Sequence, residues 1–170
     1  MVSKRLLRSA PFAALLLSAT GLSAAHAQDS AQAAMSQPSW TLSTMLEVLR
    51  ADANSWGIGP TVAIRHDFES KWGVELRAAL PAFNGSGGAA LDLAATYTSI
   101  TKSTELGGSL GATGFLVGDQ SELTGGGVGL YLAAHATGWL SRGFGLTGGA
   151  NLRTALGTFP AAFAGVALRF

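Results

Sequence analysis

The side chains best suited to acid–base or nucleophilic chemistry are few in this sequence. His135 is the only histidine well inside a stretch that predicts a strand. Tyr131 and Thr137 are odd-numbered like His135, so the three share one parity and would lie on the same face of that strand. A nucleophile must lie within hydrogen-bond reach of its base, and the sequence does not place a hydroxyl such as Ser109 beside His135. The chain has no cysteine and no closely spaced pair of histidines that would suit a metal ion. We therefore predict no catalytic residue, no metal and no cofactor, and we expect Tyr131 and His135 to form at most a polar site in the interior.

The elements that must position these side chains have a period of two. In residues 160–170 one parity is entirely apolar and the other carries the only charge, which is the alternation of a β-strand. Tilted strands that cross a membrane need about 9–11 residues, whereas ordinary strands have about five or six. Seven earlier stretches alternate in the same way at about this membrane-spanning length: 41–51, 57–66, 71–80, 89–100, 104–117, 127–140 and 143–156. The sequence therefore predicts an all-β fold, an eight-stranded antiparallel up-and-down transmembrane β-barrel.

The connections between these strands are expected to alternate in length. Residues 52–56, 81–88 and 118–126 are longer and rich in turn residues, and the joins at 67–70, 101–103 and 141–142 are tighter. Such alternation is typical of a barrel with long loops on one rim and short turns on the other. The last connection, 157–159, is shorter than this rhythm predicts.

The alternation alone leaves open which face lies inside. A soluble lipocalin-like barrel would turn the Leu/Val parity inward around a ligand, whereas a membrane barrel turns it toward lipid. The polar parity consists mainly of Gly, Ala, Ser and Thr, which is too little charge for the surface of a soluble barrel. Aromatic residues near the predicted strand ends are typical of membrane interfaces; they are Trp40, Trp56, Trp72, Trp139 and Phe144. We therefore interpret the Leu/Val parity as facing lipid.

The inward parity then collects four acidic and four basic side chains. A buried, unpaired charge costs several kcal/mol, so these groups are expected to form paired networks. The expected lumen charge network comprises Glu47, Arg65, Glu75, Arg77, Asp92, Glu105, Arg153 and Arg169. We expect this network largely to plug the lumen, because eight strands leave an interior that side chains just fill. The other hypothesis is a narrow, gateable path for water or small ions.

The N-terminal sequence predicts export from the cytoplasm. Residues 1–27 combine a basic start, a short apolar core and an Ala25-His26-Ala27 cleavage site, which is the pattern of a secretory signal peptide. Residues 28–39 are small and polar and are expected to be a flexible lead-in to a barrel at 40–170. Without the signal peptide the chain has 8 basic residues (11 − 3) and 10 acidic ones, so its net charge is −2 and it has no basic patch for a nucleic acid.

The terminal residues Val166, Leu168 and Phe170 resemble the C-terminal assembly signal of bacterial outer-membrane β-barrel proteins. Over 40–170 the chain is similar in architecture to the small eight-stranded members of that group, the OmpA transmembrane domain and OmpX, by pattern and length but without a specific motif. The resemblance implies insertion in the outer membrane. The sequence leaves the oligomeric state open, and a monomer is the expectation. The resemblance implies as partners outer-membrane lipids and lipopolysaccharide, periplasmic chaperones and the outer-membrane barrel assembly machinery.

Three functions remain open at this point. The first is a non-enzymatic integral barrel that serves envelope integrity or the minor permeation of water and small solutes. The second is an outer-membrane enzyme that modifies lipid A or phospholipid, and it would need His135 near a hydroxyl at an accessible site. The third is a soluble periplasmic binding barrel with Leu and Val inside.

Overall fold

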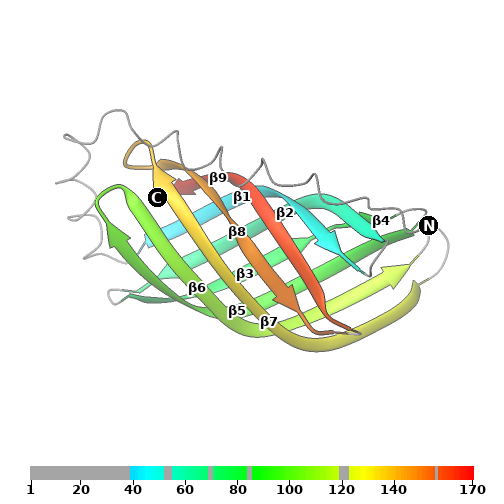
Figure 1. The fold of residues 1–170 in the computed structure, drawn as a ribbon. Helices are drawn as coiled ribbons and strands as arrows, with labels where there is room; N and C mark the ends of the chain where they lie inside the picture. The colour runs from blue at the N-terminus through cyan, green and yellow to red at the C-terminus, as the bar shows by residue number, and fades with distance from the viewer. Residues whose placement is uncertain (1–38, 52–54, 69–70, 84–85, 119–122, 156) are drawn as a thin grey trace, which may run out of the picture.

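The chain forms one closed barrel of antiparallel strands (Figure 1). The computed structural model describes residues 39–51, 55–68, 71–83, 86–118, 123–155 and 157–170. The predicted signal peptide and all of the predicted lead-in except Ser39 lie outside them. The strands are β1 Ser39–Arg50, β2 Trp56–Asp67, β3 Trp72–Ala79, β4 Ala82–Phe83, β5 Ser86–Thr101, β6 Thr104–Gly118, β7 Leu123–Trp139, β8 Phe144–Arg153 and β9 Phe159–Arg169.

The first and last strands close the barrel. β1 pairs with β2 on one side and with β9 on the other, so the described sheet has no long free edge. β4 is a short continuation of β3 beyond Leu80 and Pro81, because it pairs with the same two neighbours, β2 and β5. β3 and β4 together therefore count as one of the eight strands of the barrel. The backbones of Trp40 and Phe170 exchange two hydrogen bonds, of 2.9 and 3.0 Å, which fastens the two ends of the barrel chain to each other.

The outward face of the barrel is apolar and the inward face is mostly polar. Leu76, Leu93 and Leu132 all point outward, and Leu93 is 61% exposed. Their alternate neighbours, such as Glu75 and Asp92, are buried inside. This arrangement confirms the predicted fold class and is the reverse of the Leu/Val interior that a soluble lipocalin-like barrel requires. Within the described residues, no helix is both long enough and apolar enough to cross a bilayer.

The predicted alternation of long and short connections is wrong. Most of 81–88 and of 118–126 belongs to strands, because β4 and β5 enclose only residues 84–85 and β7 begins at Leu123. The glycines at 125–127 pair with Val117, Leu116 and Phe115 of β6. Glycine favours turns through its backbone freedom, but it still supplies both hydrogen-bonding groups of a ladder, and a neighbouring strand can hold it extended.

The aromatic residues at the strand ends divide into two groups. Trp40, Trp56, Trp72 and Phe144 are exposed on the outer wall, where the sequence predicts an interfacial belt. Trp139 is different, because it is only 7% exposed and lies inside the barrel. The prediction that Trp139 belongs to the belt is therefore wrong. Along β7, Trp139 has the same parity as the lumen residues His135 and Thr137. Its side chain therefore lies on the inward face of the strand.

Candidate functional site

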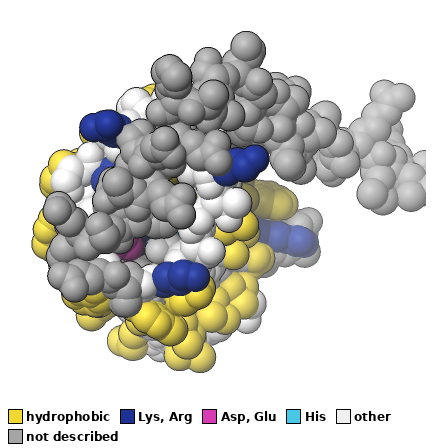
Figure 2. Space-filling model, turned by 90° about the vertical axis from the view of Figure 1, so that its left-hand side faces the viewer, with side chains coloured by type: hydrophobic (Ala, Val, Ile, Leu, Met, Phe, Trp, Pro, Cys, Tyr) yellow, Lys and Arg dark blue, Asp and Glu magenta, His cyan; other side chains and the backbone are white. Residues whose placement is uncertain are grey.

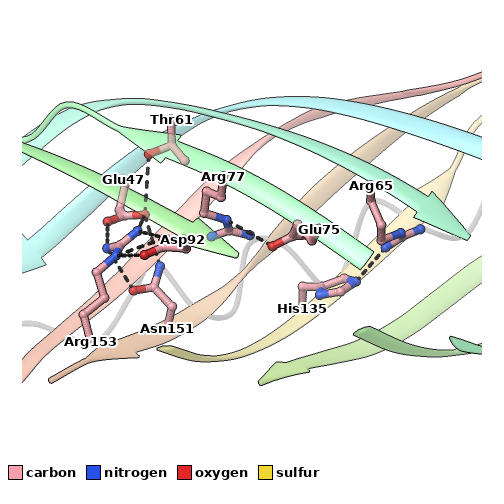
Figure 3. A network of polar contacts seen from close by, with 9 residues as sticks. All are labelled: Glu47, Thr61, Arg65, Glu75, Arg77, Asp92, His135, Asn151 and Arg153. Atoms are coloured by element: carbon pink, nitrogen blue, oxygen red, sulfur yellow. Dashed lines mark hydrogen bonds and ion pairs between the residues drawn. The ribbon is translucent and has the colours of Figure 1, made fainter. Parts of the chain in front are cut away.

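The part of the lumen near the ends of β1 and β8 holds a cluster centred on Arg153, which comprises Glu47, Thr61, Asp92, Asn151 and Arg153 (Figure 3). The guanidinium of Arg153 donates to Glu47 Oε1 at 2.5 Å and to both oxygens of Asp92 at 2.8–3.1 Å. Asn151 donates to Glu47 Oε2 at 3.1 Å. The fixed fork of arginine donors lets one cation bridge two carboxylates. This Arg153 cluster ties β1, β5 and β8 together across the lumen.

A second cluster lies near the end of the barrel where β1 begins and β9 ends, the terminal end. The carboxylate of Glu105 accepts hydrogen bonds from Arg65 and Arg169, and it also accepts one from Trp139 Nε1 at 3.2 Å. Arg65 donates in turn to Asp67 Oδ2 at 3.1 Å. This Glu105 cluster joins residues of β2, β6, β7 and β9, and it contains two cations and two anions. Its charges are therefore balanced within the lumen.

His135 belongs to the Glu105 cluster as a hydrogen-bond acceptor. Its Nε2 lies 3.1 Å from Nη1 of Arg65, and a guanidinium can only donate. A hydrogen bond from Arg65 therefore uses the lone pair of Nε2, and Glu105 Oε1 lies 3.9 Å from the same atom. Gly107 of β6 makes room for this ring, because a Cβ at Gly107 would lie 2.3 Å from His135 Nε2. The nitrogen that would act as a base is already occupied by Arg65.

A sequence motif that deserves testing is Gly107–Gly108–Ser109–Leu110–Gly111, which matches the G-x-S-x-G pattern of hydrolases and which the sequence reading overlooked. That pattern activates a serine only on a sharp turn between a strand and a helix. Here Ser109 lies in the middle of β6, and its Oγ has no hydrogen-bond partner among the described residues. The motif therefore lacks the geometry of a nucleophile.

Arg77 and Glu75 lie between the two clusters (Figure 3). Arg77 Nε is 3.3 Å from Glu75 Oε1, and the guanidinium packs over the ring of Phe163 at 4.4 Å and over that of Tyr131 at 5.6 Å. Arg77 Nη1 and the Tyr131 hydroxyl have no hydrogen-bond partner among the described residues. Buried polar groups of this kind are normally satisfied by ordered water. The middle of the lumen is thus the section suited to hold water.

At the end of the barrel opposite the Glu105 cluster, the lumen is closed by an apolar layer that the sequence analysis missed. Leu49 and Phe115 are fully buried there, and Phe115 stacks on Phe159 with 5.1 Å between the ring centroids. The rest of the layer consists of Ala79, Ala90, Ala155 and Ala161, with Phe83 and Val117 packed against it. The available signal was parity, because Leu49 and Phe115 alternate with the lipid-facing Val48 and Leu116. The inward parity as a whole appeared polar, and this concealed its apolar end.

No protein-family model matches the chain, and no curated protein matches it. Among solved structures, Ail of Yersinia pestis has a TM-score of 0.58 at 15% identity, covering 78% of this chain and 97% of Ail. The N-terminal β-barrel domain of Pseudomonas aeruginosa OprF has a TM-score of 0.59 at 14% identity (76% and 97%). Neisserial surface protein A has a TM-score of 0.59 at 12% identity (78% and 97%).

The fold is that of small bacterial outer-membrane β-barrels. At these identities the likeness establishes the architecture, and it transfers no functional residue. Each of the matched chains is covered almost completely, so the eight-stranded body of this chain corresponds to the whole barrel of those proteins.

In this outer-membrane-type barrel, the eight charged residues expected in the lumen all point inward. The structure gathers them into three groups, the Arg153 cluster, the Glu105 cluster and the pair Arg77–Glu75, instead of one continuous network. Tyr131 lies beside Arg77 and His135 beside Arg65, so they do not form a common polar site. Val166, Leu168 and Phe170 lie on the outward face of the last strand and at its end. Within the described ranges no cluster of His, Cys, Asp and Glu could hold a metal ion.

Proposed function

We propose that this chain is a non-enzymatic, integral outer-membrane barrel with a closed lumen, which contributes to envelope integrity. The observation that carries the proposal is the combination of an apolar outer wall with a lumen filled by ion pairs and an apolar layer. An apolar wall of this size is costly in water and favourable in lipid. Permeation is then limited to water or very small solutes.

Cell fractionation tests the membrane part of the proposal. Membranes are washed with alkaline carbonate or with urea, and the protein is followed in the pellet and the wash. An integral barrel stays in the pellet until detergent is added. A soluble periplasmic binding protein would appear in the wash, and that result would overturn the proposal.

Planar-bilayer recording tests the closed lumen. We expect no stable, porin-like conductance from the wild-type protein, because the Phe115–Phe159 layer and the two ion-pair clusters lie in series along the lumen. We expect that Arg153→Met alone leaves the barrel closed, since it leaves the apolar layer in place. The combination Phe115→Ala and Arg153→Met should conduct more than either single variant. A large wild-type conductance would contradict the proposal.

The enzyme alternative finds little support in the geometry. His135 Nε2 is engaged by Arg65, and no hydrogen bond joins His135 to a described hydroxyl. Unchanged lipid A and phospholipid profiles on overexpression are the expected result. A new lipid species that disappears in the His135→Ala variant would instead favour the enzyme.

Adhesion is the role that the name of one similar structure suggests, since Ail is the attachment invasion locus protein. The four connections at the end of the barrel opposite the terminal end are residues 51–55, 84–85, 119–122 and 154–158. They offer few residues for a docking surface of ordinary size, which takes about 20–30 residues on each partner. We therefore do not extend adhesion to this chain.

The proposed route to the membrane begins with cleavage after Ala27 and continues through periplasmic chaperones to the barrel assembly machinery. The residues proposed as the recognition signal are Val166, Leu168 and Phe170, and the assembled protein is proposed to be a monomer. N-terminal sequencing of the membrane form should begin at Gln28. Deletion of Phe170 should reduce the amount of assembled barrel, and unchanged assembly would remove this signal from the account.

A further inference from the structure

The terminal end of the barrel, where β1 begins and β9 ends, bears an exposed cation on each of its three connections. Lys71 closes the connection between β2 and β3, Lys102 lies between β5 and β6, and Arg142 lies between β7 and β8. No ion pair joins any of the three to a described residue. Figure 2 looks onto this end and shows basic side chains spaced around the rim, with hydrophobic side chains on the wall behind them.

The two ends of the barrel differ in charge by sequence. The three connections at the terminal end, 68–71, 102–103 and 140–143, contain three cations and one acid, Glu69. The four connections at the other end contain Asp52, Asp119 and Glu122 and no lysine or arginine. The cation nearest to that end, Arg50, is the last residue of β1 and stacks over Trp56 at 5.7 Å. By sequence, the connections at the terminal end therefore carry a net positive charge and those at the other end a net negative charge.

These cations border the aromatic belt of the outer wall. Lys71 immediately precedes Trp72, which packs edge-on against Tyr97 with 5.1 Å between ring centroids. Arg142 precedes the exposed Phe144 by two residues. Tryptophan and tyrosine rings sit at the level of lipid headgroups, so residues just beyond them reach the phosphates. The chain position of the cations thus matches the depth of a headgroup layer.

We propose that Lys71, Lys102 and Arg142 form a binding surface for the anionic phospholipid headgroups of the leaflet at the terminal end. This inference rests on the proposed membrane function and adds a lipid class to it. A lysine or arginine close to an anionic surface strengthens association roughly fivefold. The effect falls off within a Debye length, so it weakens as salt is added.

Quenching of tryptophan fluorescence by brominated lipid tests the proposal. The full-length membrane form is placed in phosphatidylcholine vesicles that contain a minor, equal fraction of either brominated phosphatidylglycerol or brominated phosphatidylcholine. Trp56, which is exposed at the other end, is replaced by phenylalanine in every sample, so that the exposed reporters are Trp40 and Trp72 at the terminal end. We expect the wild type to associate with phosphatidylglycerol at least fivefold more strongly at low salt. The triple variant Lys71→Gln, Lys102→Asn, Arg142→Gln should lose this preference.

The variants are chosen to keep the barrel folded. Lys102 has a φ of 58°, a left-handed conformation that asparagine tolerates better than most residues, which is the reason for Lys102→Asn. Arg50→Gln removes an exposed cation at the opposite end and should keep the preference. The charge-conserving triple Lys71→Arg, Lys102→Arg, Arg142→Lys should also keep it. The heat-dependent mobility of the folded barrel on gels verifies folding in each sample.

Failure of this inference can be separated from failure of the membrane function. If brominated phosphatidylglycerol quenches the wild type and the neutral triple variant equally, the cationic surface is refuted. Quenching of both proteins by brominated phosphatidylcholine would in that case still support the membrane function. An equal loss of preference in Arg50→Gln would also refute it. If neither brominated lipid quenches the wild type, the barrel is not in the bilayer and the proposed function fails.

Discussion

Arg153 forms ion pairs with the carboxylates of Glu47 and Asp92 in the lumen and is itself fully buried. Arg153→Met would leave Glu47 and Asp92 buried without their cation. Removal of one partner from a buried ion pair costs about 3–5 kcal/mol, because the remaining charge is not compensated. We expect a loss of this size in the free energy of unfolding, measured by urea titration in lipid vesicles.

A matched triple variant provides the control for Arg153. Arg153→Met combined with Glu47→Gln and Asp92→Asn removes the uncompensated charges together with the cation. Most of the lost stability should return, since neutral groups cost far less to bury than ions. A triple variant that is as unstable as Arg153→Met alone would mean that packing, and not charge, dominates the cluster.

Trp139 tests the lumen assignment at the residue scale. Its indole donates to the buried Glu105, while Trp72 lies on the outer wall. A variant that keeps Trp139 as its sole tryptophan should show little quenching by brominated lipid, because the barrel wall separates the ring from the acyl chains. A variant that keeps only Trp72 should be quenched strongly. Equal quenching of the two would place Trp139 outside.

The sequence predicts the side of each charged residue but not its partner. Parity alone places Asp92 and Arg77 in the lumen, and these two are register partners on β5 and β3. Yet the carboxylate of Asp92 binds Arg153 of β8, across the lumen. That choice depends on how the tilted strands bring distant positions to the same height, and it cannot be derived from the alternation of one strand. The apolar layer was missed for a different reason, because its members share the inward face with many more polar residues from the same strands.

At the element scale, β6 contains glycines with opposite surroundings. A Cβ on Gly111 would lie 2.0 Å from the carbonyl oxygen of Leu93 on β5, so the backbone itself would have to move. A Cβ on Gly114 would meet nothing within 4 Å. We expect Gly111→Ala to cost at least about 1–3 kcal/mol of unfolding free energy. Gly114→Ala should be neutral or slightly stabilising, because glycine weakens strand interiors.

The comparison of these two variants isolates the close approach of β5 and β6. Both substitutions are the same, and both lie in the same strand, so differences in strand propensity cancel. Measurement of both by urea unfolding in the same vesicles is sufficient. Equal stability of the two variants would contradict the strand packing described here.

The strands themselves were largely predictable, and the connections were not. A period of two over ten or more residues requires a strand with two distinct faces. For this reason the predicted stretch 71–80 matches β3 to within one residue at each end, and 89–100 lies within β5. The glycine-rich stretches at 84–88 and 125–127 suggest turns by composition. The pairing of 86–88 and of 125–127 depends on neighbouring strands that continue alongside them, and a single-strand pattern does not contain this information.

At the scale of the whole molecule, the cost of placing a charge on the outward face should depend on its depth in the bilayer. Leu76 lies in the middle of β3, and Leu140 lies in the connection at the terminal end. Arginine on the lipid face costs about 2–4 kcal/mol at the midplane and about 0–1 kcal/mol near the interface. We therefore expect Leu76→Arg to destabilise the barrel in vesicles much more than Leu140→Arg. Equal costs at the two sites would exclude a bilayer centred on the strands.

The central claim is that the leucine-rich face of each strand contacts acyl chains while the charged face is enclosed. Because the chain has no cysteine, a nitroxide spin label can be attached at a single introduced cysteine. Labels at Leu91, Leu93 and Ala95 of β5 in lipid vesicles can be compared for collision with oxygen, which partitions into lipid, and with a water-soluble nickel complex. The account predicts more collisions with oxygen than with nickel at all three sites, and the highest ratio at the site nearest the bilayer centre. Labels that are shielded from both reagents would place this face inside the barrel and would contradict the account.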